Sequence, residues 1–165
     1  MRNATLLLAG FLALVPFDAA QAQSMEGMWL TRGGDLEGKF GIDFRPHGPN
    51  YCGALAWLKE PNQGGRPKTD NKNPAEGLRS RPLLGLNIMP LLTSESGERL
   101  AGDMYDPDSG KTYWVKLGSI RNGTVEAKIC VHLFGVPCRT HALERLSADQ
   151  IAKLSPPIKR NSSCQ

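Results

Sequence analysis

Apolar and polar residues alternate along several short runs of this chain, and this alternation is what most limits how the chain can fold. The clearest run is 40–45, in which Phe40, Ile42 and Phe44 are separated by Gly41 and Asp43. A period of two places alternate side chains on one face of a β-strand. With the opening segment included, about eight strands are predicted, at 27–30, 40–45, 51–59, 83–92, 98–105, 111–119, 123–131 and 138–146.

Two of these runs carry an additional signal. In 51–59 both faces are apolar, with Leu55 and Trp57 expected on one face and Ala54 and Ala56 on the other, which predicts a strand that is covered on both sides. In 83–92, Pro90 predicts a strand that lies at a sheet edge or ends there, because proline has no N–H for the ladder.

The links between the runs predict how the strands are arranged. Most are short turns, and Asn122-Gly123 is a strong two-residue hairpin signal. Successive strands joined in this way form an antiparallel meander, and about eight strands close a small barrel that has room for side chains or one small ligand. The sequence therefore predicts an all-β barrel, and its candidate interior residues are Trp29, Phe40, Ile42, Phe44, Val115 and Leu117.

The two ends of the chain differ from the barrel segment. Residues 1–22 combine Arg2, an apolar run too short to span a membrane and Ala20-Gln21-Ala22, which is typical of a signal peptide cleaved near Ala22. A buried helix is the less favoured interpretation. The barrel domain is expected over 23–146. Residues 147–165 form a C-terminal extension in which Ser147 and Gln150 predict a capped short helix to about Leu154.

Export changes how the four cysteines are interpreted, because thiols pair in an oxidising compartment. Cys130 and Cys138 flank a short turn, which favours a disulfide across a hairpin, and Cys52 and Cys164 are then left to pair with each other. A zinc site is disfavoured because there is no C-x-x-C pair and the three histidines are scattered. No metal and no cofactor are expected.

The formal net charge of +4 is modest. It could favour an anionic ligand or an anionic envelope surface. Nucleic-acid binding is not expected, because the chain has no dense basic stripe interleaved with aromatic residues. No catalytic residues are predicted either, since the serines lack a G-x-S-x-G elbow and the histidines lack a nearby orienting acid.

A long charged loop at 60–81 interrupts the strand pattern. A loop of this length within a compact domain is either functional or disordered. Arg79 and Arg81 occupy alternate positions, so in an extended chain they would project the same way and could clamp a carboxylate or phosphate. The favoured alternative is that they hold the loop in place by pairing with Asp70, Glu76 or Asp106.

A second polar cluster occupies 103–113. Asp106 and Asp108 suggest calcium, but Asp-Pro-Asp-Ser-Gly has the residues of a hairpin turn, and the turn is the favoured interpretation. Together the two polar segments supply the candidate ligand-binding residues, which are Asp70, Asn73, Arg79, Arg81, Tyr105, Asp106, Lys111 and Tyr113.

Several motifs in this chain resemble one bacterial exported family, catalogued as domain of unknown function 2147. They are Gly27-x-Trp29, Cys52-Gly53, 57–61, Asp-Asn-Lys-Asn-Pro at 70–74, 78–86 and 105–113. The resemblance implies a small lipocalin-like (calycin-like) β-barrel in the periplasm or secreted, with no established activity and no catalytic residues. The chain departs from the family at Leu143, where the family usually has a tryptophan, and in its C-terminal extension. A barrel end that is more open or differently filled would follow from the first departure.

The leading functional hypothesis is a non-enzymatic protein that binds a small apolar or amphipathic ligand at the mouth of the barrel. The long loop would act as a lid, and Arg79 and Arg81 would meet an acidic head group. The alternative is an envelope interaction protein with a filled barrel that docks a protein partner or the cell wall. A hydrolase is the third and least favoured hypothesis.

Overall fold

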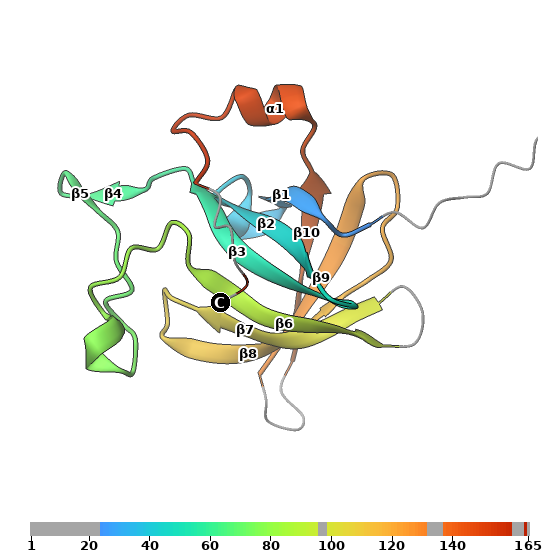
Figure 1. Ribbon diagram of the computed structural model, residues 1–165, viewed down its shortest axis with the longest axis horizontal. Helices are drawn as coiled ribbons and strands as arrows, with labels where there is room; N and C mark the ends of the chain where they lie inside the picture. The colour runs from blue at the N-terminus through green and yellow to red at the C-terminus, as the bar shows by residue number, and fades with distance from the viewer. Residues whose placement is uncertain (1–23, 96–98, 132–136, 160–163, 165) are drawn as a thin grey trace, which may run out of the picture.

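In the part of the chain that the computed structural model describes, residues 24–95, 99–131, 137–159 and 164, eight antiparallel strands close into a barrel (Figure 1). Around the barrel the strand order is β1-β10-β9-β8-β7-β6-β3-β2. The predicted all-β barrel is therefore confirmed. The barrel strands are β1 (Gly27–Arg32), β2 (Phe40–His47), β3 (Asn50–Leu58), β6 (Asn87–Glu95), β7 (Arg99–Asp106), β8 (Lys111–Leu117), β9 (Thr124–Cys130) and β10 (Arg139–Arg145).

The remaining elements lie in the connections and the tail. The β1–β2 connection contains the 3-10 turn η1 (Gly34–Leu36). The crossover from β3 to β6 carries the small hairpin β4 (Asn62–Gln63) and β5 (Arg66–Pro67), followed by η2 (Glu76–Leu78), and it projects from one end of the barrel in Figure 1. The predicted signal peptide, residues 1–22, lies outside the described residues.

The predicted C-terminal helix is present as α1 (Ala148–Ala152). Its cap is the expected one, because the Ser147 side chain accepts from the Gln150 backbone N–H while the Gln150 side chain accepts from the Ser147 N–H. No helix within the described residues is both long and apolar enough to cross a membrane.

Large side chains fill the centre of the barrel. Trp29, Ile42, Phe44, Val115 and Leu117 are buried in one apolar cluster, and Phe40 packs against that cluster while remaining partly exposed. Leu143 is also buried there and pairs in register with Val125. An aliphatic side chain therefore fills the barrel at this position of β10.

Two irregularities in strand pairing correct the expectations for individual residues. Gly41 pairs with Trp57 and Ile42 pairs with Leu55, so Ala56 forms a bulge. This bulge turns Leu55 into the central cluster and Trp57 to the outside, instead of both to one face. Pro90 lies in the middle of β6, and the closed barrel offers no sheet edge at which it could lie. Proline is tolerated there because the β3–β6 register shifts between Gly53 and Tyr51, and a bulge does not need the N–H that proline lacks.

The C-terminal tail covers a second apolar cluster on the outer face of the barrel. Met28, Leu30, Ala56, Trp57 and Leu146 form this cluster, and the tail adds Ile151, Leu154 and Ile158. The Trp57 Nε1–H donates to the Pro156 carbonyl oxygen at 2.9 Å, and the Lys159 N–H donates to the Ala56 carbonyl oxygen at 2.7 Å. The apolar outer face of β3 is explained by this cover.

Two disulfides are present, Cys130–Cys138 and Cys52–Cys164. They are the two pairs that the sequence favoured. The first joins the end of β9 to the residue before β10, and the second fastens the end of the tail to β3, with a Cα–Cα distance of 5.7 Å. Two disulfides in one small domain indicate an oxidising compartment.

Candidate functional site

The mouth of the barrel is the end at which the β1–β2, β3–β6 and β7–β8 connections lie. A mainly apolar cavity of about 80 Å³ opens there, which we call the inner cavity. Residues from β2, β3, β6, β7 and the connections line it. They are Phe40, Leu55, Leu58, Leu83, Ile88, Met104, Tyr105, Asp106, Pro107 and Asp108.

A larger and more polar cavity of about 450 Å³ lies next to the inner cavity, and we call it the vestibule. Leu83, Pro107 and Asp108 line both. The other vestibule residues come from the first half of the crossover. They are Glu60, Asn62, Gln63, Lys68, Thr69, Asn71 and Lys72. The two cavities therefore lie side by side around these three residues, and the inner cavity is the more apolar of the two.

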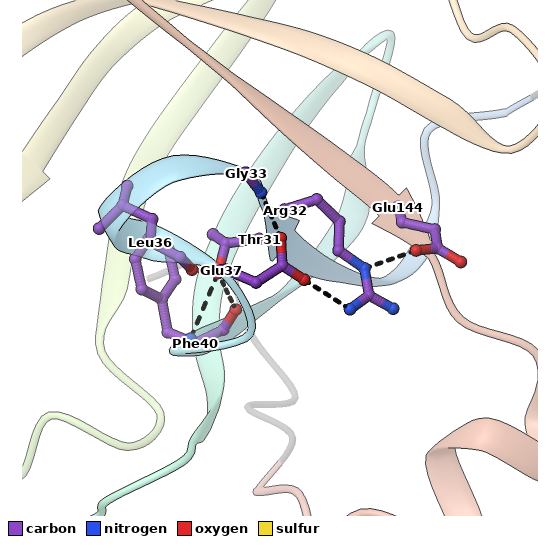
Figure 2. A network of polar contacts seen from close by, with 7 residues as sticks. All are labelled: Thr31, Arg32, Gly33, Leu36, Glu37, Phe40 and Glu144. Carbon is purple, nitrogen blue, oxygen red and sulfur yellow. Dashed lines mark hydrogen bonds and ion pairs between the residues drawn. The ribbon is translucent and has the colours of Figure 1, made fainter.

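Phe40 is held at the inner cavity by the β1–β2 connection (Figure 2). The Oγ1 of Thr31 lies 2.6 Å from the carbonyl oxygen of Leu36 and 3.1 Å from that of Phe40, which ties both ends of the connection to β1. Arg32 pairs with Glu37 at 2.9 Å and with Glu144 of β10 at 2.5 Å. Figure 2 shows this guanidinium between the two carboxylates. Glu37 of the connection is therefore linked to β1 directly and to β10 through Arg32.

Asp70 is a buried residue of the crossover whose carboxylate binds other parts of the crossover and β7. Its exposed fraction is 0%, and its carboxylate accepts hydrogen bonds from the Tyr105 hydroxyl at 2.6 Å and from Arg81 Nε at 2.9 Å. The Nδ2 of Asn73 donates to the same carboxylate at 2.7 Å. A buried carboxylate is costly unless donors surround it. Asp70 therefore joins both arms of the crossover to β7.

Tyr105 keeps its proton under ordinary conditions. Burial raises the pKa of its hydroxyl to about 12, and the hydrogen bond to Asp70 acts in the same direction. A phenol that stays protonated remains a donor, so the bond between β7 and the crossover persists across the physiological pH range.

The two arginines hold the crossover together, as the favoured alternative predicted. Arg79 donates from Nε to the carbonyl oxygen of Asn73 at 2.8 Å, and Arg81 is paired with Asp70. They do not project as an extended pair, because Arg79 ends the η2 turn in a helical conformation with φ −67° and ψ −21°. Neither arginine lines the inner cavity or the vestibule.

The β7–β8 turn completes the other wall of the site. Asp106 accepts from the Asp108 N–H at 3.0 Å and from the Ser109 hydroxyl at 2.6 Å, which is the hairpin-turn arrangement. Gly110 has a φ of 71°, and a Cβ there would overlap the carbonyl oxygen of Lys72. Lys72 in turn donates from Nζ to the Asp108 carbonyl oxygen at 2.5 Å. The turn and the crossover are therefore packed together.

The predicted ligand-binding residues have three different placements. Tyr105 and Asp106 line the inner cavity, whereas Asp70, Asn73, Arg79 and Arg81 support the crossover. Lys111 is exposed at the start of β8, and the Tyr113 hydroxyl lies 3.4 Å from the Ser109 hydroxyl behind the turn. Within the described residues, no three histidine, cysteine, aspartate or glutamate side chains are grouped so that they could hold a metal ion.

Sequence reasoning missed most of the residues that line the site. Five of the six predicted interior residues do not line the inner cavity, and only Phe40 does. The missed apolar residues are Leu55, Leu58, Leu83, Ile88 and Met104, and the missed vestibule residues are Glu60, Asn62, Gln63, Lys68, Thr69, Asn71 and Lys72. Pro107 and Asp108, which line both cavities, were missed as well. A usable signal was the polar stretch that directly follows the apolar end of β3.

Comparison with known proteins agrees with this architecture. The profile of a family described as "Uncharacterized protein conserved in bacteria (DUF2147)" matches residues 27–145. A solved structure from Helicobacter pylori, described as belonging to the lipocalin family, is similar with a TM-score of 0.71 and 24% sequence identity, over 85% of this chain and 93% of that chain. This likeness shows the fold. No curated protein matches the chain.

Proposed function

The chain belongs to the bacterial family DUF2147 and has a lipocalin-like fold, and from this premise we propose that it is an exported protein that binds a small amphipathic ligand at its barrel mouth. The role is binding rather than catalysis. Export to the periplasm or the cell exterior would follow cleavage of the signal peptide at residues 1–22, and the two disulfides support an oxidising destination.

One observation carries the proposal, namely that the inner cavity and the vestibule lie side by side and share Leu83, Pro107 and Asp108 in their lining. An apolar recess beside a polar chamber matches a molecule with one apolar end and one polar end. The recess of about 80 Å³ is well below the roughly 300–1,000 Å³ of typical ligand pockets. It therefore accepts only a short apolar end, and the rest of the ligand lies in the vestibule.

The vestibule favours a head group that is polar but uncharged. Its two lysines already have partners, Lys68 with Glu60 at 4.0 Å and Lys72 with the Asp108 carbonyl. The neutral side chains of Asn62, Gln63 and Asn71 have no side-chain hydrogen bond to any described residue. Amide groups donate and accept, so they suit hydroxyl or amide groups on a ligand.

The test uses three probes that separate the two halves of such a ligand. We expect hexyl glucoside, with a short chain and an uncharged head, to bind in isothermal titration calorimetry more tightly than hexanoate or glucose. Leu58→Trp fills the inner cavity and should weaken hexyl glucoside binding at least about tenfold, which corresponds to about 1.4 kcal/mol. Leu91→Trp is the matched control, because Leu91 is 43% exposed on the outside of β6.

Two outcomes would contradict the proposal. One is binding of hexyl glucoside that Leu58→Trp leaves unchanged, and the other is no binding of any of the three probes. The second outcome would favour the alternative role, docking to an envelope protein, for which the observation in favour is the central cluster built on Trp29 and Phe44 that fills the barrel. Capture of such a partner on immobilised protein would then be the next measurement.

A further inference from the structure

A third cavity, about 700 Å³ in volume, lies on the outer surface of the barrel and shares no lining residue with the inner cavity or the vestibule. It runs across the outer surface of β8 and β9, between the start of β7 and the start of β10, and the β8–β9 connection forms one wall. We call it the basic groove. Its lining residues are Arg99, Lys116, Leu117, Gly118, Ser119, Arg121, Thr124, Glu126, Lys128 and Thr140.

Strand register explains why the basic groove is charged. On β8 and β9 the side chains of Val115, Leu117 and Ala127 are buried in the barrel, so the intervening side chains project outward. Lys116 and Lys128 are such outward residues, and they are directly opposite each other in the β8–β9 pairing. Like charges opposite each other on neighbouring strands destabilise a sheet.

The cations of the groove are only partly neutralised. Lys116 is paired with Glu95 at 2.9 Å. Among the residues that the structure describes, none forms an ion pair with Arg99, Arg121 or Lys128. Glu126 is the one carboxylate in the lining, so the groove keeps a net positive charge. Positive charges that repel one another in a concave surface favour binding of an anion, because the anion reduces the repulsion.

The wall of the groove is held by backbone hydrogen bonds rather than by a ligand. The Arg121 N–H donates to the Thr124 carbonyl oxygen at 2.8 Å, and the Thr124 N–H donates back to the Arg121 carbonyl oxygen at 2.9 Å. The Gly118 N–H donates to the Glu126 carbonyl oxygen at 2.9 Å. The groove is therefore preformed, and a ligand would not need to order its wall.

We propose that the basic groove binds a phosphate ester whose remaining part carries hydroxyl groups. Arg99, Arg121 and Lys128 supply charge and N–H donors for the phosphate, since arginine presents a fork to phosphate oxygens and lysine acts as a point charge. Ser119, Thr124 and Thr140 add hydroxyls, and Glu126 is an acceptor for hydroxyl groups of the ligand. The volume of about 700 Å³ falls within the usual range for a small molecule, roughly 300–1,000 Å³.

Two sources could present such a group, a soluble phosphate ester or the head group of an anionic phospholipid. The first arm of the test measures glycerol phosphate binding by isothermal titration calorimetry, with glycerol as the uncharged comparison. The second arm measures co-sedimentation with phosphatidylglycerol vesicles, with phosphatidylcholine vesicles as the comparison. Binding of glycerol phosphate, of phosphatidylglycerol vesicles or of both supports the proposal and identifies the source.

Lys128→Gln tests whether the groove is responsible. We expect it to weaken the binding found in either arm about tenfold, as loss of a charge-assisted contact does. Without ligand it should make the protein slightly more resistant to urea, because it removes the repulsion with Lys116. Lys153→Gln makes the same charge change on an exposed residue at the end of α1 that does not line the groove, and should alter neither binding nor stability.

The proposal is overturned if neither glycerol phosphate nor phosphatidylglycerol vesicles bind. It is also overturned if Lys128→Gln and Lys153→Gln weaken binding equally, since only the net charge would then matter. The basic groove shares no lining residue with the inner cavity or the vestibule, so this result is independent of the hexyl glucoside experiment. Leu58→Trp should leave glycerol phosphate binding unchanged.

Discussion

The Asp70 carboxylate is buried beneath the crossover with three side-chain donors around it. We predict that Asp70→Asn destabilises the protein by about 2–3 kcal/mol, the usual cost when a charge-assisted hydrogen-bond network loses its acceptor. The new amide would bring a donor against the donors of Arg81 and Asn73. Urea denaturation followed by circular dichroism measures the loss.

Asp35→Asn provides the matched control for Asp70. Asp35 is an exposed aspartate of η1, so the same substitution there should change stability by less than about 0.5 kcal/mol. Equal effects of the two substitutions would show that Asp70 is not the support of the crossover. A large effect of Asp70→Asn with intact hexyl glucoside binding would separate this structural role from ligand binding.

Tyr105 makes stability depend on pH in the alkaline range. Its pKa is raised to about 12 in the folded protein, against about 10 in an unfolded chain. Between these values the folded state keeps a proton that the unfolded state releases. The contribution is therefore fully present below about pH 10 and is lost as the pH rises toward 12.

Titration of tyrosinate absorbance can check this pKa. The chain has three tyrosines, and Tyr105→Phe should remove the component that titrates at the highest pH. The same variant should show a smaller loss of stability above about pH 10 than the parent protein. A highest component that survives in Tyr105→Phe would assign the raised pKa to another tyrosine.

The two arginines show which site properties the sequence could not settle. Alternate spacing predicts a pair on one side only if the backbone is extended, and the η2 turn places Arg79 in a helical conformation. The residue types were compatible both with arginines that bind an anionic ligand and with arginines that hold the loop in place. The choice depended on whether Asp70 is buried within hydrogen-bond distance of Arg81. Burial of a single polar residue is set by tertiary packing, which a residue pattern does not encode.

At the scale of strands and turns, the period-two pattern predicted which segments pair but not where the pairing slips. The Ala56 bulge moves Trp57 to the outer face, and the bulge near Pro90 lets β6 continue through a proline. Each bulge inverts the facing of every residue beyond it. Local errors in the predicted interior follow from this, although the strand order does not change.

The tail and the β9–β10 hairpin allow a comparison of the two disulfides. Cys52–Cys164 spans a sequence separation of 112, whereas Cys130–Cys138 spans 8. On the chain-entropy relation, these loops contribute about 4.8 and about 2.6 kcal/mol respectively. We predict that Cys52→Ala/Cys164→Ala lowers the urea midpoint more than Cys130→Ala/Cys138→Ala does. The reverse order would mean that the tail is held by its apolar contacts and not by the covalent link.

On the scale of the whole molecule, we expect the closed barrel and the tail to unfold as one unit only while the Cys52–Cys164 disulfide is intact. The tail contributes Ile151, Leu154 and Ile158 to the outer cluster, which shares β1 and β3 with the central cluster. Two hydrogen bonds, from Trp57 to Pro156 and from Lys159 to Ala56, add to this contact. So few contacts would hold a segment that is fixed at one end only weakly, but they suffice for one that β10 fixes at its start and the Cys52–Cys164 disulfide fixes at its end.

The tryptophans report this difference, because Trp29 is buried in the barrel, Trp57 lies under the tail and Trp114 is on β8. We predict that each single-tryptophan variant, retaining Trp29 or Trp57, gives the same urea midpoint by fluorescence as by circular dichroism, as a cooperative transition requires. In the Cys52→Ala/Cys164→Ala background, the fluorescence of the variant that retains Trp57 should change at lower urea than its circular dichroism, whereas the two signals should still coincide in the variant that retains Trp29. Separate midpoints with both disulfides intact would contradict the single unit, because the tail would then detach locally while the barrel stays folded.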